Sequence, residues 1–135
     1  MRGMKRVSYA ELIILIMMLC LIARMVAPQF VEASPEEKVC ELIDELEIMR
    51  AGLDLYRAEH GGRILPADSL AGFEAAMTTK VGRYGPYIKE VPTNPFNGLK
   101  TVRFDGKPAG AGTAGWRFDT ESGLFQADNS GYSAL

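Results

Sequence analysis

A single acidic residue, Glu11, stands at the start of a long apolar run, and its position indicates a chemical role more clearly than that of any other residue. Leu12–Ala23 carries no charge, and a basic cluster of Arg2, Lys5 and Arg6 precedes Glu11. A carboxylate at the border of a membrane segment is costly unless a cation satisfies it. The pattern favours an N-terminal helix that meets other copies of itself; the alternative is a carboxylate that lies in the lipid headgroup layer.

Two further patterns lack the partners that their chemistry needs. His60 is the only histidine, no cysteine lies near it, and no nucleophile elbow is present, so neither a transition-metal site nor a Ser/His/Asp assembly is expected. Gly110–Gly115 fits G-x-G-x-x-G, but it leads into a predicted strand and not into the helix whose N-terminus would bind phosphate. We expect His60 at a helix end and the glycine run in a flexible hairpin loop.

The cysteines, Cys20 and Cys40, are not expected to pair within the chain. On one helix they would stand about 30 Å apart, whereas a disulfide needs Cα atoms within about 7 Å. We expect Cys20 to be a small apolar residue of the membrane segment and Cys40 to lie on a helix face.

Length and charge limit the remaining classes. At 135 residues the chain holds one modest domain plus an appendage. Its 15 basic and 17 acidic residues give a net charge of -2. No basic stripe stands outside the first six residues, so nucleic acid is not an expected main partner.

The basic start and the apolar run predict a membrane segment, with the start of the chain in the cytoplasm and the remainder outside. A secretory signal peptide cut near Val31-Glu32-Ala33 is one interpretation, but Glu11 and Arg24 fit it poorly. A simple anchor is another. The uncharged stretch spans only about 18 Å, short of the roughly 30 Å hydrocarbon core. A full span therefore needs Arg24 to reach the outer headgroups.

A third interpretation rests on the positions of Glu11 and Pro28 when both are counted from Val7. Counted from Val7, Glu11 is the fifth residue and Pro28 of Pro28-Gln29-Phe30 is the twenty-second. The segment resembles the type IV pilin-like proteins, the pilins and pseudopilins, whose mature chains begin with a hydrophobic residue and carry Glu and Pro at those positions. The resemblance implies cleavage between Arg6 and Val7 by a prepilin peptidase and N-terminal methylation. It also implies pairing of the new amine with Glu11 of a neighbouring copy.

Arg6 departs from the family pattern, which usually has glycine before the cut. Cleavage there depends on a tolerant peptidase, or else the leader stays attached. Pro28 removes one helical hydrogen bond. That weak point suits a filament subunit that leaves the bilayer, and in a plain anchor it marks the membrane exit.

A helix beyond the membrane segment is predicted by Ser34-Pro35-Glu36-Glu37, which forms a capping box with proline at the first position, and by the stop signal Gly61-Gly62. Pro35 indicates that a long helix from the membrane is kinked or interrupted near Ser34. Apolar residues with helical spacing are expected to pack on a sheet: Val39, Leu42, Ile43, Leu46, Met49, Leu53 and Tyr56.

The rest of the chain predicts a short helix, a loop and strands. Ser69–Thr79 fits a helix, and the glycines and prolines of Gly85–Gly98 predict irregular chain. Three strands are expected around a turn at Thr120–Gly123: Leu99–Phe104, Gly115–Asp119 and Leu124–Ala127. The expected fold is α+β and pilin-like. A long N-terminal helix, made of a membrane part and a periplasmic part, is expected to pack on a small C-terminal antiparallel β-sheet.

The expected organisation has three parts: a basic cytoplasmic leader at 1–6, a hydrophobic membrane and assembly helix at 7–30, and a periplasmic domain at 31–135. Within the last part, a helix at 34–60 is followed by a loop and short helix at 61–98 and by the sheet at 99–135.

The third part resembles the major G-type pseudopilins of type II secretion systems. The resemblance rests on three motifs in order: Leu53–Gly62 with Pro66, Gly85–Phe96, and Gly115–Asp119 with Gly123. It implies a calcium site in the C-terminal loop, and Asp119, Asp128 and Ser130 are the candidate ligands. Calcium takes six to eight oxygens, and the family's full ligand pattern is not matched here. The alternative is an acidic, solvated turn.

The resemblance implies a structural subunit and not an enzyme. It would self-associate into a filament that supports protein export, with other pseudopilins and the inner-membrane platform of the secretion system as partners. It would lie in the bacterial inner membrane, with a cytoplasmic N-terminus and a periplasmic domain, or in a periplasmic filament. One alternative is an anchored minor pilin or binding module for an exported protein, sugar or DNA, with contacts at 81–98; another is a secreted enzyme released by signal peptidase.

Overall fold

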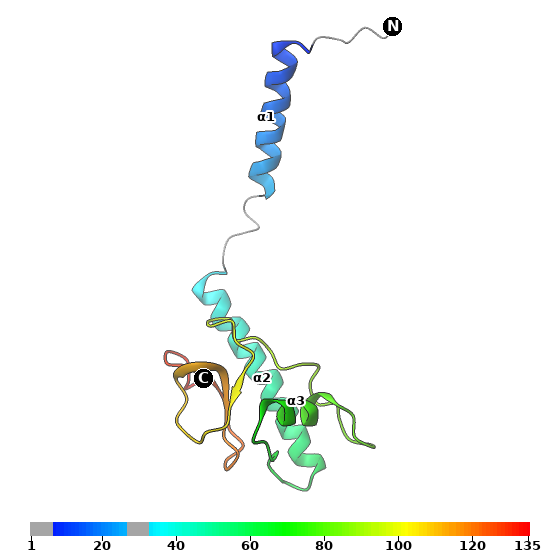
Figure 1. Ribbon diagram of the computed structural model, residues 1–135, viewed down its shortest axis with the longest axis vertical. Helices are drawn as coiled ribbons and strands as arrows, with labels where there is room; N and C mark the ends of the chain where they lie inside the picture. Colours follow the sequence, from blue (N-terminus) through cyan, green and yellow to red (C-terminus); the bar gives the residue numbers. More distant parts are fainter. Residues whose placement is uncertain (1–6, 27–32) are drawn as a thin grey trace. The chain divides into compact units, whose positions relative to one another are not determined.

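A computed structural model describes residues 7–26 and 33–135 of the chain. The chain divides into two compact units, Met1–Ala33 and Ser34–Leu135, and we call the second unit the head. The described residues form an α+β protein with three helices and one three-stranded mixed sheet (Figure 1).

The described part of the first unit is dominated by helix α1 (Tyr9–Val26). Its sequence is built almost entirely from Leu, Ile, Met and other apolar residues. The helix starts with a bond from the Leu12 amide to the Ser8 carbonyl at 3.0 Å. Within 7–26 and 33–135, no helix combines the length and the hydropathy of a candidate membrane span.

The prediction of one long N-terminal helix is wrong for the described residues. Ala33 and Ser34 are not helical, and a separate helix, α2, spans Pro35–Glu59. The cause is local, because Ser34 and Glu37 form a complete capping box and Pro35 has no N–H to extend an earlier helix. The predicted interruption near Ser34 is therefore confirmed. Pro28 lies outside the described residues.

The sheet has the order β1 (Val102–Arg103), β2 (Ala111–Phe118), β3 (Phe125–Asn129). The β2 and β3 strands pair antiparallel around the predicted turn, but β1 pairs parallel to β2. The expected antiparallel sheet is therefore a mixed one. The chain between β1 and β2 folds back around Arg103, which binds Asp105 and the Pro108 carbonyl, so that it enters β2 in the direction of β1.

Most of the glycine run lies in a strand and not in the predicted flexible loop: Ala111–Gly115 belongs to β2, and Gly110 directly precedes it. β2 begins at Ala111, and its pairing with β3 is irregular between Ala111 and Trp116. Gly110 and Gly112 have φ values of 107° and 70°. Glycine adopts these left-handed conformations without strain, which allows the irregularity.

Helix α3 (Leu70–Thr78) confirms the predicted short helix. The Ser69 hydroxyl caps it by accepting from the Gly72 amide at 3.3 Å. Residues 80–101 then run without helix or strand, as their prolines predict, apart from one bridge between Val81 and Tyr84.

The buried face of α2 follows the predicted stripe. The helix packs against β3 and α3 through Leu42, Leu46, Met49 and Leu53. Ile43 is an exception and is 38% exposed, because it lies one helical step, about 100°, from Leu42. The core that these side chains form with the sheet is centred on aromatic residues: Phe73, Trp116, Phe118 and Phe125.

Candidate functional site

Glu11 lies in the first turn of α1 and caps its own helix. The Ser8 amide donates to Glu11 Oε2 at 2.9 Å. A carboxylate is also favoured at this helix end by the helix dipole. It offers about four lone-pair positions, so it retains room for another donor. Val7 is 70% exposed before the helix, and Arg6 lies outside the described residues.

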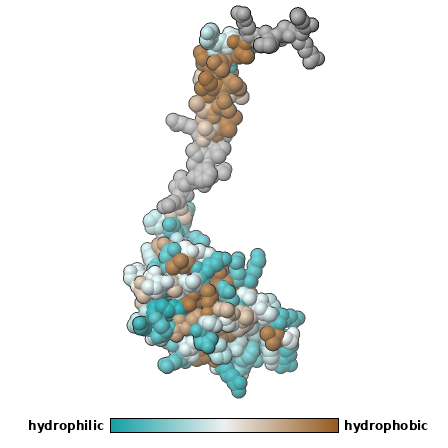
Figure 2. Space-filling model, in the orientation of Figure 1, coloured by the Kyte–Doolittle hydropathy of each residue, from teal (hydrophilic) through white to brown (hydrophobic). Residues whose placement is uncertain are grey.

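The large apolar side chains of α1 from Leu12 to Ile22 are exposed, and the face of the helix in view in Figure 2 is hydrophobic along most of its described length. Consecutive helical residues point in all directions around the axis. The large side chains from Leu12 to Ile22 remain between 46% and 67% exposed. Cys20 shares this surface, and Cys40 is exposed on α2; both thiols are free. A surface of this kind needs lipid or protein to cover it.

Asp128 is the most heavily bonded carboxylate of the head. Its side chain is completely buried, and Arg103 Nη2 donates to its Oδ1 at 2.6 Å. The amides of Gly110, Ala111 and Ala114 donate to the same carboxylate at 3.0, 3.2 and 3.1 Å. Burial raises the pKa of Asp128, but Arg103 and the amides outweigh it and hold the pKa below its ordinary value.

The three calcium candidates do not form one site. The register pairs Phe118 with Phe125 and Ala111 with Asn129, so Asp119 and Asp128 lie at opposite ends of the β2–β3 pair. Asp119 Oδ1 accepts the Glu121 amide at 3.0 Å, and this bond contributes most to lowering the Asp119 pKa. Ser130 is exposed beyond β3. In the described residues no three His, Cys, Asp or Glu side chains are placed to hold a metal.

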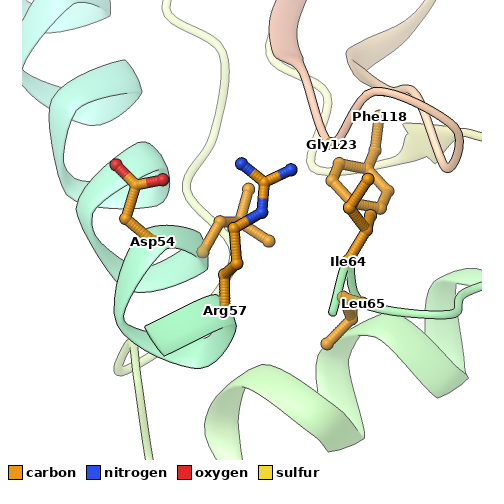
Figure 3. A pocket seen from close by; sticks show the side chains of 7 residues that line it. Asp54, Arg57, Ile64, Leu65, Phe118 and Gly123 are labelled. Atoms are coloured by element: carbon orange, nitrogen blue, oxygen red, sulfur yellow. The ribbon is translucent and has the colours of Figure 1, made fainter. Parts of the chain in front are cut away.

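Two arginines of α2 bind the turn and strand that follow β2. Arg57 reaches across towards Gly123, with Phe118 and Ile64 nearby (Figure 3), and donates to the Ser122 carbonyl at 3.1 Å. A Cβ at Gly123 would lie 2.9 Å from Arg57 Nη2. Arg50 donates to the Phe125 carbonyl through Nε and Nη2, at 3.2 and 3.0 Å. An open cleft of about 360 Å³ lies between these groups.

His60 lies at the end of α2, as predicted, inside an aromatic cluster. Its ring stacks on Tyr56 with centroids 3.9 Å apart, and its Nδ1 is 2.9 Å from the Tyr56 carbonyl. Tyr87 donates to Glu59 at 2.7 Å. Burial, followed by that bond, raises the pKa of Tyr87 to about 12. The cluster borders an apolar pocket of about 170 Å³.

Arg103 and Asn94 are structurally central residues that the sequence patterns missed. Asn94 is fully buried; its Nδ2 donates to the Gly115 carbonyl at 2.8 Å, and its Oδ1 accepts the Phe96 amide at 2.9 Å. The Pro92–Pro95 segment could have indicated Asn94. In a loop without strands, a buried side-chain amide can bond the main-chain groups that no neighbouring strand satisfies. Asp105 lies two residues from Arg103, but no sequence pattern indicates its buried partner Asp128, which is 25 residues away.

Comparisons with protein-family models, with curated protein sequences and with solved structures found no match for this chain. A functional assignment therefore depends on the chemistry of the chain's own residues.

Proposed function

We propose that the chain is a structural subunit of a type IV pilin-like filament, of the kind that the major pseudopilin builds in a type II secretion system. It assembles through α1 and supports protein export from the bacterial inner membrane, and the role requires no catalysed reaction. The observation that carries the proposal is a helix that is apolar on all sides and has a carboxylate in its first turn.

The exposed apolar surface of α1 favours this proposal over that of an ordinary soluble domain. Helices of soluble domains have a polar face, whereas a helix that is apolar all round is covered by lipid or by other helices. The head, in contrast, buries its own apolar core around Trp116 and Phe73. One unit thus has a complete core, and the other exposes the surface that an assembly would cover.

In this proposal Glu11 determines the axial position at which one subunit meets the next. Its Oε2 accepts the Ser8 amide, and the remaining lone pairs can accept a cation from a second copy. In surroundings of low dielectric, a pair between Glu11 and a freed Val7 amine fixes the axial register more than it adds stability. A prepilin peptidase that accepts Arg6 would release this amine.

The mature N-terminus provides the first test. We expect mass spectrometry of the chain from bacterial membranes to find a start at Val7 with a methylated amine. A start near Ser34 would instead indicate a secreted protein, and an uncut chain would indicate an anchor that does not assemble in this way.

Filament assembly provides the second test. We expect Glu11→Ala to abolish the sedimentable filaments released by shearing cells that also express the secretion machinery. Glu36→Ala is the matched control, because Glu36 is an exposed acid in the first turn of α2 and lies outside the capping bonds. Equal filament yields from the two variants would contradict the assembly role of Glu11.

The alternative is an anchored binding module, whose contacts are expected at 81–98; a cleft elsewhere in the head is a second place where it could bind a ligand. The largest arginine-lined cleft offers little to a ligand, because Arg50 and Arg57 both donate to main-chain carbonyls. Their bonds hold α2 to the sheet. This cleft therefore gives the binding module no support.

A further inference from the structure

The Arg103 guanidinium lies in a cage of oxygen atoms. Its nitrogens donate to both carboxylate oxygens of Asp105, both of Asp128 and the carbonyl of Pro108, at distances of 2.6 to 3.3 Å. The Arg103 side chain is only 12% exposed, and Asp128 is completely buried. Five oxygens from three residues therefore converge on one buried cationic group.

This ligand set is of the type that binds a hard divalent cation. Calcium prefers carboxylate and carbonyl oxygens and tolerates irregular geometry. Here a planar guanidinium fills the position, and its fork matches two carboxylates. A metal ion beside it would meet a positive charge at short range.

We propose that Arg103 is the built-in cation of the head and replaces a divalent metal ion. The cage joins the end of β1, the loop at 105–110 and β3, which are the elements that a bound metal would otherwise hold together. The head then folds without calcium. Removal of the arginine side chain leaves a vacant cage that accepts a divalent cation. This inference concerns the head alone and does not depend on α1 or on filament assembly.

An exchange needs the cage to rearrange. The five oxygens bond three different nitrogens and not one central point, so a calcium ion with ligands at about 2.3–2.6 Å cannot reach all of them where they now lie. Asp105, which is 38% exposed and lies in a segment without helix or strand, would have to move towards Asp128. Water would supply the remaining ligands. Asp128 stays fixed by the amides of Gly110, Ala111 and Ala114.

The test follows thermal unfolding of the full chain in a neutral detergent. Trp116 is the only tryptophan and is fully buried in the head, so its fluorescence reports the unfolding of that unit. For the native chain we expect the same Tm in chelator and in millimolar calcium. For Arg103→Ala in chelator we expect a Tm lower by roughly 10 °C or more. Millimolar calcium should restore part of that loss.

Arg50→Ala is the matched control. Arg50 is another partly buried arginine of the head, but it donates only to the carbonyls of Phe125 and Leu135. We expect its loss to lower the Tm with no response to calcium. If Arg103→Ala is unfolded in chelator, the same prediction requires calcium to return the native Trp116 emission.

Three results would overturn the inference. One is a native chain whose Tm falls in chelator, because the head would then need a metal after all. Another is Arg103→Ala that stays insensitive to calcium. The third is an equal calcium response in Arg50→Ala, which would show a non-specific effect.

Discussion

Ser8-Tyr9-Ala10-Glu11 opens α1 and Ser34-Pro35-Glu36-Glu37 opens α2, so both helices begin with serine and glutamate three residues apart. In α2 the exchange is complete: the Ser34 amide donates to Glu37 at 3.0 Å, and the Glu37 amide donates to the Ser34 hydroxyl at 3.2 Å. In α1 the bond found among the described residues is the one from the Ser8 amide to Glu11. The glutamate of each helix start therefore accepts one backbone amide. The two starts differ at the serine hydroxyl: that of Ser34 accepts the Glu37 amide, and no matching bond from the Glu11 amide to the Ser8 hydroxyl is found within the described residues.

The head and α1 also differ in how many donors their carboxylates have and in how far their apolar side chains are covered. In the head, Asp128 is buried and bonded by an arginine and three amides, and leucines such as Leu46 are covered. In α1, Glu11 has one backbone donor, and leucines of equal size are more than 40% exposed. The polar and apolar groups of the head are satisfied within the head, whereas α1 leaves acceptor positions on Glu11 and a large apolar surface uncovered. Each prediction below changes one side of this comparison.

The largest effect is expected from Gly115→Ala. A Cβ at this position would lie 2.1 Å from the Leu99 carbonyl oxygen, a backbone atom that cannot swing away. We expect a loss of at least about 4 kcal/mol in the free energy of unfolding of the head. Urea titration followed by Trp116 fluorescence measures it. Gly131→Ala has open space around its Cβ and should stay within about 0.5 kcal/mol of the native chain. Similar losses in both variants would contradict this packing.

Truncation of equivalent side chains in the two units should separate stability from assembly. Leu46 is 1% exposed, and Leu46→Ala should cost the head about 2–5 kcal/mol. Ile14 is 60% exposed, so Ile14→Ala should leave the head's unfolding curve unchanged. It should instead reduce the yield of sheared filaments. Loss of head stability in Ile14→Ala would show that α1 belongs to the core after all.

Acid should weaken the head through Asp128 and Asp105. Their pKa values are lower in the folded chain than the ordinary value of 3.8. A carboxyl of this kind stabilises the fold above its unfolded pKa, and that contribution disappears as the pH falls through the folded pKa. The urea midpoint should therefore drop as the pH decreases below about 4. Asp128→Asn should show a shallower drop; an unchanged pH profile would argue against the Asp128 contribution.

The smallest effect is expected at the helix starts. Ser34→Ala removes the hydroxyl that accepts the Glu37 amide and should cost the head about 1 kcal/mol. Ser8→Ala keeps the main-chain amide that bonds Glu11, so filament yield should remain at the native level. Trp116 fluorescence measures the first effect, and sedimentation of sheared filaments measures the second. A fall in filament yield in Ser8→Ala would assign the Ser8 hydroxyl a role that the bond to Glu11 does not require.

Local signals predicted the local features of the fold. Ser34, Pro35 and the two glycines after His60 determine where α2 starts and stops, because caps and positive φ act over a few residues. Ser69 does the same for α3. The parallel pairing of β1 could not be predicted from the sequence. It depends on the loop after β1, which is held by the bond from the Arg103 side chain to the Pro108 carbonyl. No spacing rule brings Arg103 and Asp128 together.

The candidate site was predictable in part. Glu11 is identified by its place beside the apolar run, because the energetic cost of a charge there is visible in the sequence. Acidic residues near the end of the sequence did not indicate which carboxylates the fold brings together. Asp119 and Asp128 are close in sequence, yet the antiparallel pairing carries them to opposite ends, and Asp128 is bonded by donors from earlier in the chain.

The bond from Arg50 to the Phe125 carbonyl has a consequence for crowded subunits. β3 is the last strand of the sheet, and an open last strand is a template on which a strand of another molecule can add. Two N–H groups of Arg50 occupy one of the carbonyls that such a strand would use. The Phe125 carbonyl is therefore already bonded within the head, which makes the addition of a foreign strand at this position of the edge less favourable.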